Sequence, residues 1–277
     1  MYLDEYKRWL AADLEDADLK PELARIEGND DEIKDRFAVA LKFGTAGLRG
    51  VLGAGTNRMN VYVVRQATQG LANWVKTQGG TQTVAISYDS RLKGWNFARE
   101  AAGVLAANDI HVRLYEELMP VPALSFATRY YHCNAGIMIT ASHNPAQYNG
   151  YKAYGPDGCQ MTDDAAAVVY ASIQKTDVLT GAKHMSFAEG VEKGLIQFVG
   201  EDCKDAFYKA IEARQVRPGL AKTAGLKLVY SPLNGTGLVP VTRVLKDIGI
   251  TDITIVPEQE YPNGYFCLLY TSPSPRD

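Results

Sequence analysis

The chain has 277 residues, of which 46% are apolar and 22% are charged, and its formal net charge is −3. At about 150 residues per domain this length predicts two domains. The mild charge excludes a large basic field that would attract nucleic acid or anionic lipid. No stretch approaches the roughly 20 apolar residues of a membrane span, and the first ten residues do not resemble a signal peptide. We therefore expect a cytoplasmic protein with no nucleic-acid or membrane partner.

The four cysteines lie far apart in the chain and form no CxxC pair. This spacing argues against a disulfide framework and against a zinc site, since both need cysteines in recurring close pairs. We expect ordinary thiols.

Helices and strands are predicted to alternate over most of the chain. Apolar residues at helical spacing indicate an N-terminal helical extension at 1–42. The next elements, in chain order, are a helix at 61–75 capped by Asn60, a strand at 84–86, a helix at 95–107, a strand at 110–115, a helix at 122–131, a strand at 135–140 and a helix at 162–175. This alternation indicates an α/β fold, a layered mixed sheet flanked by helices, with ligands at strand ends.

A second, similar unit begins near residue 200 with the helix-like stretch GEDCKDAFYKAIEARQ. It continues with a strand at 226–230, the turn SPLNGTG, a helix at 238–248 and a strand at 253–256. The pattern then stops, and the last eleven residues, CLLYTSPSPRD, continue neither period. We expect a complete first domain at 43–198, a truncated second domain at 199–266 and an unrelated tail at 267–277.

The most informative stretch is ITASHNPAQYNGYKAYGPDG, which runs from an apolar strand into a polar loop. Ser142 offers a hydroxyl there, His143 an imidazole, and Lys152 follows after a second turn at Asn149 and Gly150. From polarity alone, the stretch would be a solvent loop. No G-x-S-x-G elbow surrounds the serine, and a directly adjacent histidine is a poor general base for it. A phosphoryl carrier fits better, because phosphoserine brings about −1.5 to −2 charge that cations and backbone N–H groups can neutralise.

Polar or glycine-rich residues also gather at three other predicted turns. The stretch KFGTAGLRGVLGAGTNRMN places five glycines around Arg49, which suits an anion site or a flexible turn equally, since it matches neither common phosphate-loop pattern. Asp89 and Arg91 follow a strand and are expected to pair as structural support. The turn SPLNGTG is a third candidate ligand loop.

The remaining acidic pair and histidines are predicted to have no chemical role. Asp16 and Asp18 form the chain's one Asp-x-Asp, which we interpret as solvated charge in the N-terminal helix. His111, His132 and His184 have no recurring partners and are expected to be surface or packed residues.

FGTAGLRG, SYDSR, TASHNP and YNGYKAYGPDG occur in the order and approximate spacing of the α-D-phosphohexomutase superfamily. From about residue 43 to 266 the chain resembles its phosphoglucomutase and phosphopentomutase branch. The resemblance implies reversible phosphoryl transfer between hexose 1-phosphate and hexose 6-phosphate. It further implies a phosphoserine, Mg²⁺ and a hexose 1,6-bisphosphate intermediate.

The same resemblance assigns roles to individual residues. Ser142 matches the phosphoserine, which also binds the metal through its phosphate, and His143 matches the histidine beside it. Arg49 matches an arginine that assists near the transferring group, and Lys152 a lysine linked with proton transfer. Thr45 and Asn144, together with Arg49 and Ser142, are implied at the substrate phosphate.

Three loops that the resemblance implies have no counterpart in this sequence: an Asp-x-Asp-x-Asp-Arg metal loop, a sugar-recognition loop and a phosphate-binding loop. We therefore expect an N-terminal fragment of a sugar-phosphate enzyme that is inactive alone, with an oligomeric state that the sequence does not define. Two alternatives stay open: a phosphopentomutase, and a non-catalytic fragment that binds phosphosugars.

Overall fold

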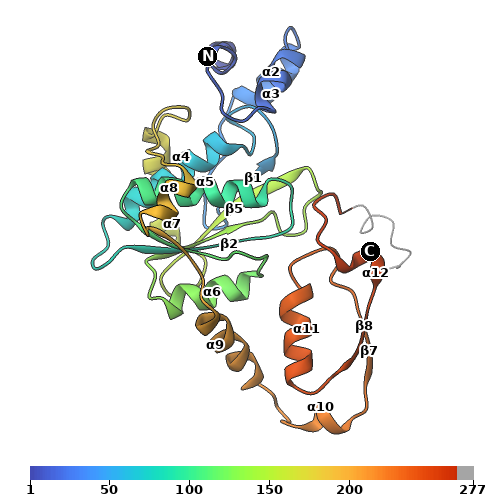
Figure 1. The fold of residues 1–277 in the computed structure, drawn as a ribbon. Coiled ribbons are helices and arrows are strands. Elements are labelled where there is room, and N and C mark those ends of the chain that lie inside the picture. The colour runs from blue at the N-terminus through green and yellow to red at the C-terminus, as the bar shows by residue number, and fades with distance from the viewer. Residues whose placement is uncertain (267–277) are drawn as a thin grey trace.

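A six-stranded mixed sheet lies at the centre of the computed structural model, which describes residues 1–266 (Figure 1). The strand order is β1-β5-β4-β2-β3-β6. The strands are β1 (Leu48–Val51), β2 (Thr83–Tyr88), β3 (His111–Leu114), β4 (Ala135–Ile139), β5 (Tyr148–Tyr154) and β6 (Ile196–Phe198). β2, β3, β4 and β6 run parallel, whereas β5 runs antiparallel to both β4 and β1. The predicted layered mixed sheet is confirmed.

Helices cover both faces of this sheet. On one face lie α4 (Val61–Val75) and α5 (Gly94–Ala107), with α7 (Asp163–Lys175) and α8 (Phe187–Glu192) packed against them. On the other lie α6 (Val121–Tyr130) and α9 (Glu201–Glu212) (Figure 1). All five residues of β4 are buried, as is typical of a parallel strand covered on both faces. The predicted cap at Asn60 is confirmed, since its side chain accepts a 3.0 Å hydrogen bond from the Val63 N–H.

Two strands lie where turns were expected. Residues 48–51 form β1, and Asn149 and Gly150, predicted as a turn, lie inside β5. Asn and Gly are depleted in strands, but tertiary contacts override that preference here. The Asn149 side chain donates to the Leu92 carbonyl at 2.9 Å. A Cβ at Gly150 would lie only 2.7 Å from the Thr140 carbonyl oxygen, so neighbouring backbone occupies the space that a side chain would fill.

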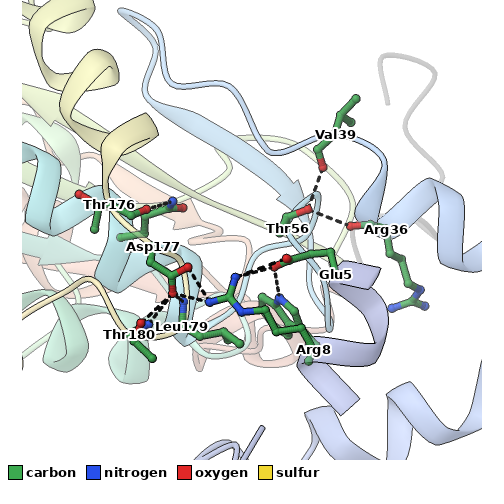
Figure 2. A network of polar contacts seen from close by, with 11 residues as sticks. Glu5, Arg8, Arg36, Val39, Thr56, Thr176, Asp177, Leu179 and Thr180 are labelled. Atoms are coloured by element: carbon green, nitrogen blue, oxygen red, sulfur yellow. Dashed lines mark hydrogen bonds and ion pairs between the residues drawn. The ribbon is translucent and has the colours of Figure 1, made fainter. Parts of the chain in front are cut away.

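The N-terminal residues form three helices, α1 (Tyr2–Ala11), α2 (Leu19–Arg25) and α3 (Asp30–Phe37). The buried Trp9 ring joins them to the sheet domain, with centroids 5.8 Å from Phe37 and 5.6 Å from Tyr62. Figure 2 shows a second attachment, in which the Arg8 guanidinium contacts Glu5 and lies 2.6 Å from an Asp177 carboxylate oxygen. The extension is therefore packed on the domain.

One prediction about polar residues is wrong in part. Asp16 and Asp18 lie between α1 and α2 and not within a helix, and both carboxylates bind Lys93 Nζ, at 2.7 and 2.8 Å, although the Asp18 side chain is 75% exposed. His184 lies at the surface, as expected, and its Nε2 is 3.0 Å from the Glu100 carboxylate. Long-range pairs of this kind leave no local pattern in the sequence. His111 and His132 are exposed, as expected, and Cys133, Cys159 and Cys203 are free thiols.

The second unit extends from α9 as a small layer beneath the sheet domain (Figure 1). It contains α10 (Leu220–Thr223), β7 (Lys227–Tyr230), α11 (Leu238–Asp247), β8 (Asp252–Ile255) and α12 (Pro257–Glu260). β7 and β8 pair in parallel, and the predicted strand-helix-strand order is confirmed. The tail predicted at 267–277 lies outside the described residues. Across residues 1–266, no helix has the length and apolarity to cross a membrane.

Candidate active site

A cavity of about 440 Å³ lies where β4 and β2 end. These strands are parallel neighbours, so the loops that follow them meet at the same sheet edge. From the first domain the cavity is lined by Asp89, Thr140, Ser142 and His143, among others. The second unit contributes its SPLNGTG turn and Phe266. Three of the four loops singled out in the sequence therefore face one space: the serine loop, the turn with Asp89 and the SPLNGTG turn.

Ser142 occupies the tip of the loop after β4, with its side chain exposed and a backbone φ of 58°. This left-handed conformation is uncommon for residues other than glycine and carries local strain. Neighbouring polar groups hold it. The Ser142 N–H donates to Thr140 Oγ1 at 2.9 Å, and Thr140 Oγ1 donates to the Asp89 carboxylate at 2.5 Å. The serine hydroxyl is thereby presented to the cavity by an ordered backbone.

His143 Nδ1 lies 3.5 Å from Ser142 Oγ, at the outer limit of a hydrogen bond. This weak contact agrees with the expectation that the adjacent histidine is a poor general base.

Asp89 and Arg91 pair beneath the serine loop, as predicted, with the Arg91 Nε 3.6 Å from the Asp89 carboxylate. The Arg91 N–H also donates to Asp89 at 3.0 Å. Burial raises the pKa of the Asp89 carboxyl, and the bonds from Thr140 and Arg91 oppose that rise. The pair forms a polar base for the loop.

Arg49 reaches the serine loop from β1, where it pairs with Gly150 of β5. Its Nη1 donates to Asn144 Oδ1 at 2.6 Å, across 95 residues of sequence. The glycine before it sets this approach. Gly47 has φ 77°, and a Cβ there would lie 1.9 Å from the Tyr151 carbonyl oxygen, so the loop rests directly on β5.

Lys152 lies on β5, opposite Met138 of β4. Burial lowers the pKa of its ammonium group, and the positive charge of Arg49 lowers it further, against the opposing effect of Asp89. These influences locate Lys152 in the same electrostatic neighbourhood as Arg49 and Asp89. An amine with a lowered pKa is suited to accept a proton.

The structure brings Ser142, His143, Asn144 and Arg49 together, but not Thr45. Within residues 1–266, the partly exposed Thr45 side chain has no hydrogen-bond partner. Of the predicted site residues, Ser142 and His143 line the cavity, whereas Thr45, Arg49, Asn144 and Lys152 do not. Sequence reasoning missed Thr140 as a support of the serine. Its position two residues before Ser142 was the available signal, because threonine hydroxyls often bond the backbone two residues ahead.

The described residues do not by themselves fit the Mg²⁺ that the resemblance implies. Among residues 1–266, no three His, Cys, Asp or Glu side chains form a group that could hold a metal ion. Asp89, the carboxylate in the cavity, is already bound by Thr140 and Arg91. The chemistry that the described residues support at the cavity is therefore that of their own side chains.

The fold is a three-layer α/β/α domain with a serine in the loop after β4 and two cationic side chains, Arg49 and Lys152, on β1 and β5. The chain belongs to the phosphoglucomutase/phosphomannomutase family, because the family model for alpha/beta/alpha domain I matches residues 40–179, half of the sequence. The predicted resemblance is confirmed at the level of the family.

Relatives and solved structures agree with this assignment. The chain is 34% identical to a phosphoglucomutase of Staphylococcus epidermidis over 249 residues, which are 89% of this chain and 44% of the relative. A Staphylococcus aureus phosphoglucomutase is 33% identical over 255 residues, with 90% and 44% covered. A crystal structure titled as a putative phosphomannomutase from Thermus thermophilus superposes with a TM-score of 0.69 at 25% identity, covering 82% of this chain and 48% of that one. The chain spans less than half the length of these proteins.

Proposed function

We propose that this chain supplies the phosphoserine-bearing part of a phosphoglucomutase-type enzyme. In that role Ser142 Oγ alternately carries and releases a phosphoryl group, and the reaction interconverts hexose 1-phosphate and hexose 6-phosphate through a hexose 1,6-bisphosphate. The observation that carries the proposal is the exposed Ser142 hydroxyl, presented to a cavity by a strained loop that Arg49 contacts through Asn144. Family membership supports it, and the whole enzyme's activity is part of the proposal.

Each side chain has a chemical task in this scheme. When a sugar hydroxyl attacks the phosphoserine, an O–P bond forms to the sugar and the bond to Ser142 Oγ breaks. The released serine oxygen takes up one proton, and the proton of the attacking sugar hydroxyl must leave. The amine of Lys152, with its lowered pKa, is the proposed acceptor of that proton. Arg49 donates one hydrogen bond to Asn144, and its remaining N–H groups can bind phosphoryl oxygens and neutralise their charge. His143 is proposed to orient the serine.

A divalent metal would supply further neutralisation of phosphoryl charge when bound, as the resemblance implies. We also propose a helical extension at 1–42 and a first domain at 43–198. Residues 199–266 belong to a second domain. Residues from both line one cavity, which supports a site at their junction. A cytoplasmic location and the lack of a nucleic-acid partner stay predictions of the sequence.

The test joins residues 1–266 to the C-terminal part of the Staphylococcus epidermidis relative and measures conversion of glucose 1-phosphate to glucose 6-phosphate. We expect Ser142→Ala to lower turnover by about 10³-fold or more, because the covalent carrier is lost. Ser125→Ala, on α6 and outside the cavity lining, is the matched control and should leave turnover unchanged. A fully active Ser142→Ala protein would overturn the proposal.

A parallel assay with ribose 1-phosphate separates the two substrate classes. Turnover of the pentose phosphate alone would replace the hexose assignment with a phosphopentomutase.

A further inference from the structure

The guanidinium of Arg91 binds the backbone of the serine loop at four points. Its Nη2 donates to the carbonyl oxygens of Ser142 at 2.8 Å and Asn144 at 2.6 Å. Its Nη1 donates to those of Pro145 and Tyr148, both at 3.0 Å. Only 4% of Arg91 is exposed, so these charge-assisted bonds are shielded from water. One buried cation therefore organises the whole loop.

This arrangement bears directly on the serine. Ser142 is held at a φ of 58°, which a free loop would rarely adopt. Two restraints act on its peptide groups: Thr140 Oγ1 accepts from its N–H, and Arg91 donates to its carbonyl oxygen. The direction of the Ser142 hydroxyl thus depends on where the Arg91 guanidinium sits.

The second unit packs on Arg91 through residues 263–266, here called the strap. The Phe266 ring is buried, and its centroid lies 5.1 Å from Arg91 Cζ. A Cβ at Gly264 would lie 2.8 Å from both the Leu92 nitrogen and the Ser90 carbonyl oxygen, so the strap touches the backbone of the Arg91 turn. A cation held against an aromatic face is stabilised by it, more so when desolvated.

The strap is tied to the cavity wall of its own unit. The Asn263 N–H donates to the Asn234 carbonyl oxygen at 3.2 Å, and the Phe266 N–H donates to that of Asn263 at 3.2 Å. The Asn234 side chain in turn donates to the Tyr261 carbonyl oxygen at 2.9 Å. Asn234 belongs to the SPLNGTG turn that lines the cavity, so this turn and the strap are tied together.

We propose that Arg91 is a positioning residue that couples docking of the second unit to the geometry of Ser142. With the strap in place, the guanidinium is shielded and its four bonds hold the loop. With the strap displaced, water reaches Arg91, competes for its N–H groups and loosens the loop. The inference rests on the proposed function, in which Ser142 is the phosphoryl carrier, and it makes that serine competent only when the second unit covers the cavity.

Hydrogen exchange on the 277-residue chain tests the coupling without any turnover. In Phe266→Ala, we expect amides of the peptide 140–148 to exchange about 3- to 30-fold faster, which is the range for losing a cation–π contact. Exchange in β2 and β4 should stay unchanged. Tyr265→Ala removes the neighbouring but exposed ring and is the matched control. Unchanged exchange in Phe266→Ala, or an equal rise in Tyr265→Ala, would overturn the inference.

A second variant tests the consequence for chemistry in the joined enzyme described above. Arg91→Lys keeps the charge but not the planar set of donors, so we expect kcat to fall about 10²-fold while KM changes less than about threefold. Arg99→Lys is the control, because Arg99 also lies over aromatic rings but outside the cavity. An unchanged kcat in Arg91→Lys would contradict the positioning role. An active Ser142→Ala enzyme would instead remove the proposed function and leave the exchange result standing.

Discussion

Gly47→Ala tests whether close backbone packing of the arginine loop builds the candidate site. The added Cβ would lie 1.9 Å from the Tyr151 carbonyl oxygen, whereas real Cβ contacts stay beyond 3.0 Å, so the loop must move by about 1 Å. Gly47 also has a φ of 77°, which costs an alanine about 1–2 kcal/mol. Overpacking adds about 1–3 kcal/mol. We expect a loss of about 2–5 kcal/mol in the free energy of unfolding, with Arg49 displaced from Asn144.

Gly44→Ala is the matched control in the same loop. A Cβ at Gly44 meets nothing within 4 Å, and its φ is not in the left-handed region. Urea denaturation followed by circular dichroism should show a lower midpoint for Gly47→Ala and a midpoint close to that of the unmodified chain for Gly44→Ala. Equal midpoints for the two variants would refute the packing argument, because the glycines differ in the contact and conformation that it invokes.

Three further predictions concern stability. Asn60→Ala should lower the free energy of unfolding by about 1–2 kcal/mol in urea denaturation, because α4 loses its N-cap. An unshifted midpoint would show that water replaces the cap. Lys152→Met should raise the melting temperature at pH 7, since the lowered pKa of Lys152 means that folding disfavours its charged form. That gain in melting temperature should vanish as the pH rises toward 10.5, the ordinary pKa of a lysine ammonium. A gain that persists at that pH would come from better packing of the methionine. Burial raises the pKa of Glu100, but bonds from His184 and Arg65 more than offset it and lower the pKa overall. The Glu100 carboxylate therefore stabilises the fold at pH values above its ordinary pKa of 4.5, and this stabilisation is lost as the pH falls through the lower pKa of the folded state. The melting temperatures of Glu100→Gln and the unmodified chain should differ at pH 7 and converge in acid. A constant difference would contradict this linkage.

The parallel half of the sheet could be predicted from sequence because burial on two faces leaves a strong local pattern. β2 and β4 are short, continuous apolar runs, and α4 begins at a recognisable cap and has helical periodicity. The antiparallel half could not be predicted in this way. β1 and β5 contain glycine and asparagine, and they are stable as strands because of contacts with residues distant in the chain.

Part of the candidate site could likewise be predicted from the sequence, and part could not. Ser142 could be found because it lies in the polar loop that follows an apolar strand. Arg49 and Lys152 could be singled out as cationic residues in predicted turns or loops, and the motif resemblance added their roles. Their proximity was not visible in the spacing, since it depends on the order β1-β5-β4. The four hydrogen bonds from Arg91 to carbonyl oxygens could not be predicted either, because no side-chain pattern encodes the positions of these backbone atoms.

The antiparallel strands determine where the two cationic side chains lie relative to the serine loop. Antiparallel pairing returns β5 along β4, so that Lys152 lies opposite Met138, and it places Arg49 opposite Gly150. Side chains alternate between the faces of a strand, so a slip of one residue between β1 and β5 would turn Arg49 to the other face. Only glycine fits at position 47, because a Cβ there would lie 1.9 Å from the Tyr151 carbonyl oxygen. A slip that moved any other residue into this position would therefore be unfavourable. The position of the Arg49 guanidinium on Asn144 of the serine loop is therefore a property of sheet register, and substitutions that disturb the register should impair the site even where they leave all its side chains in place.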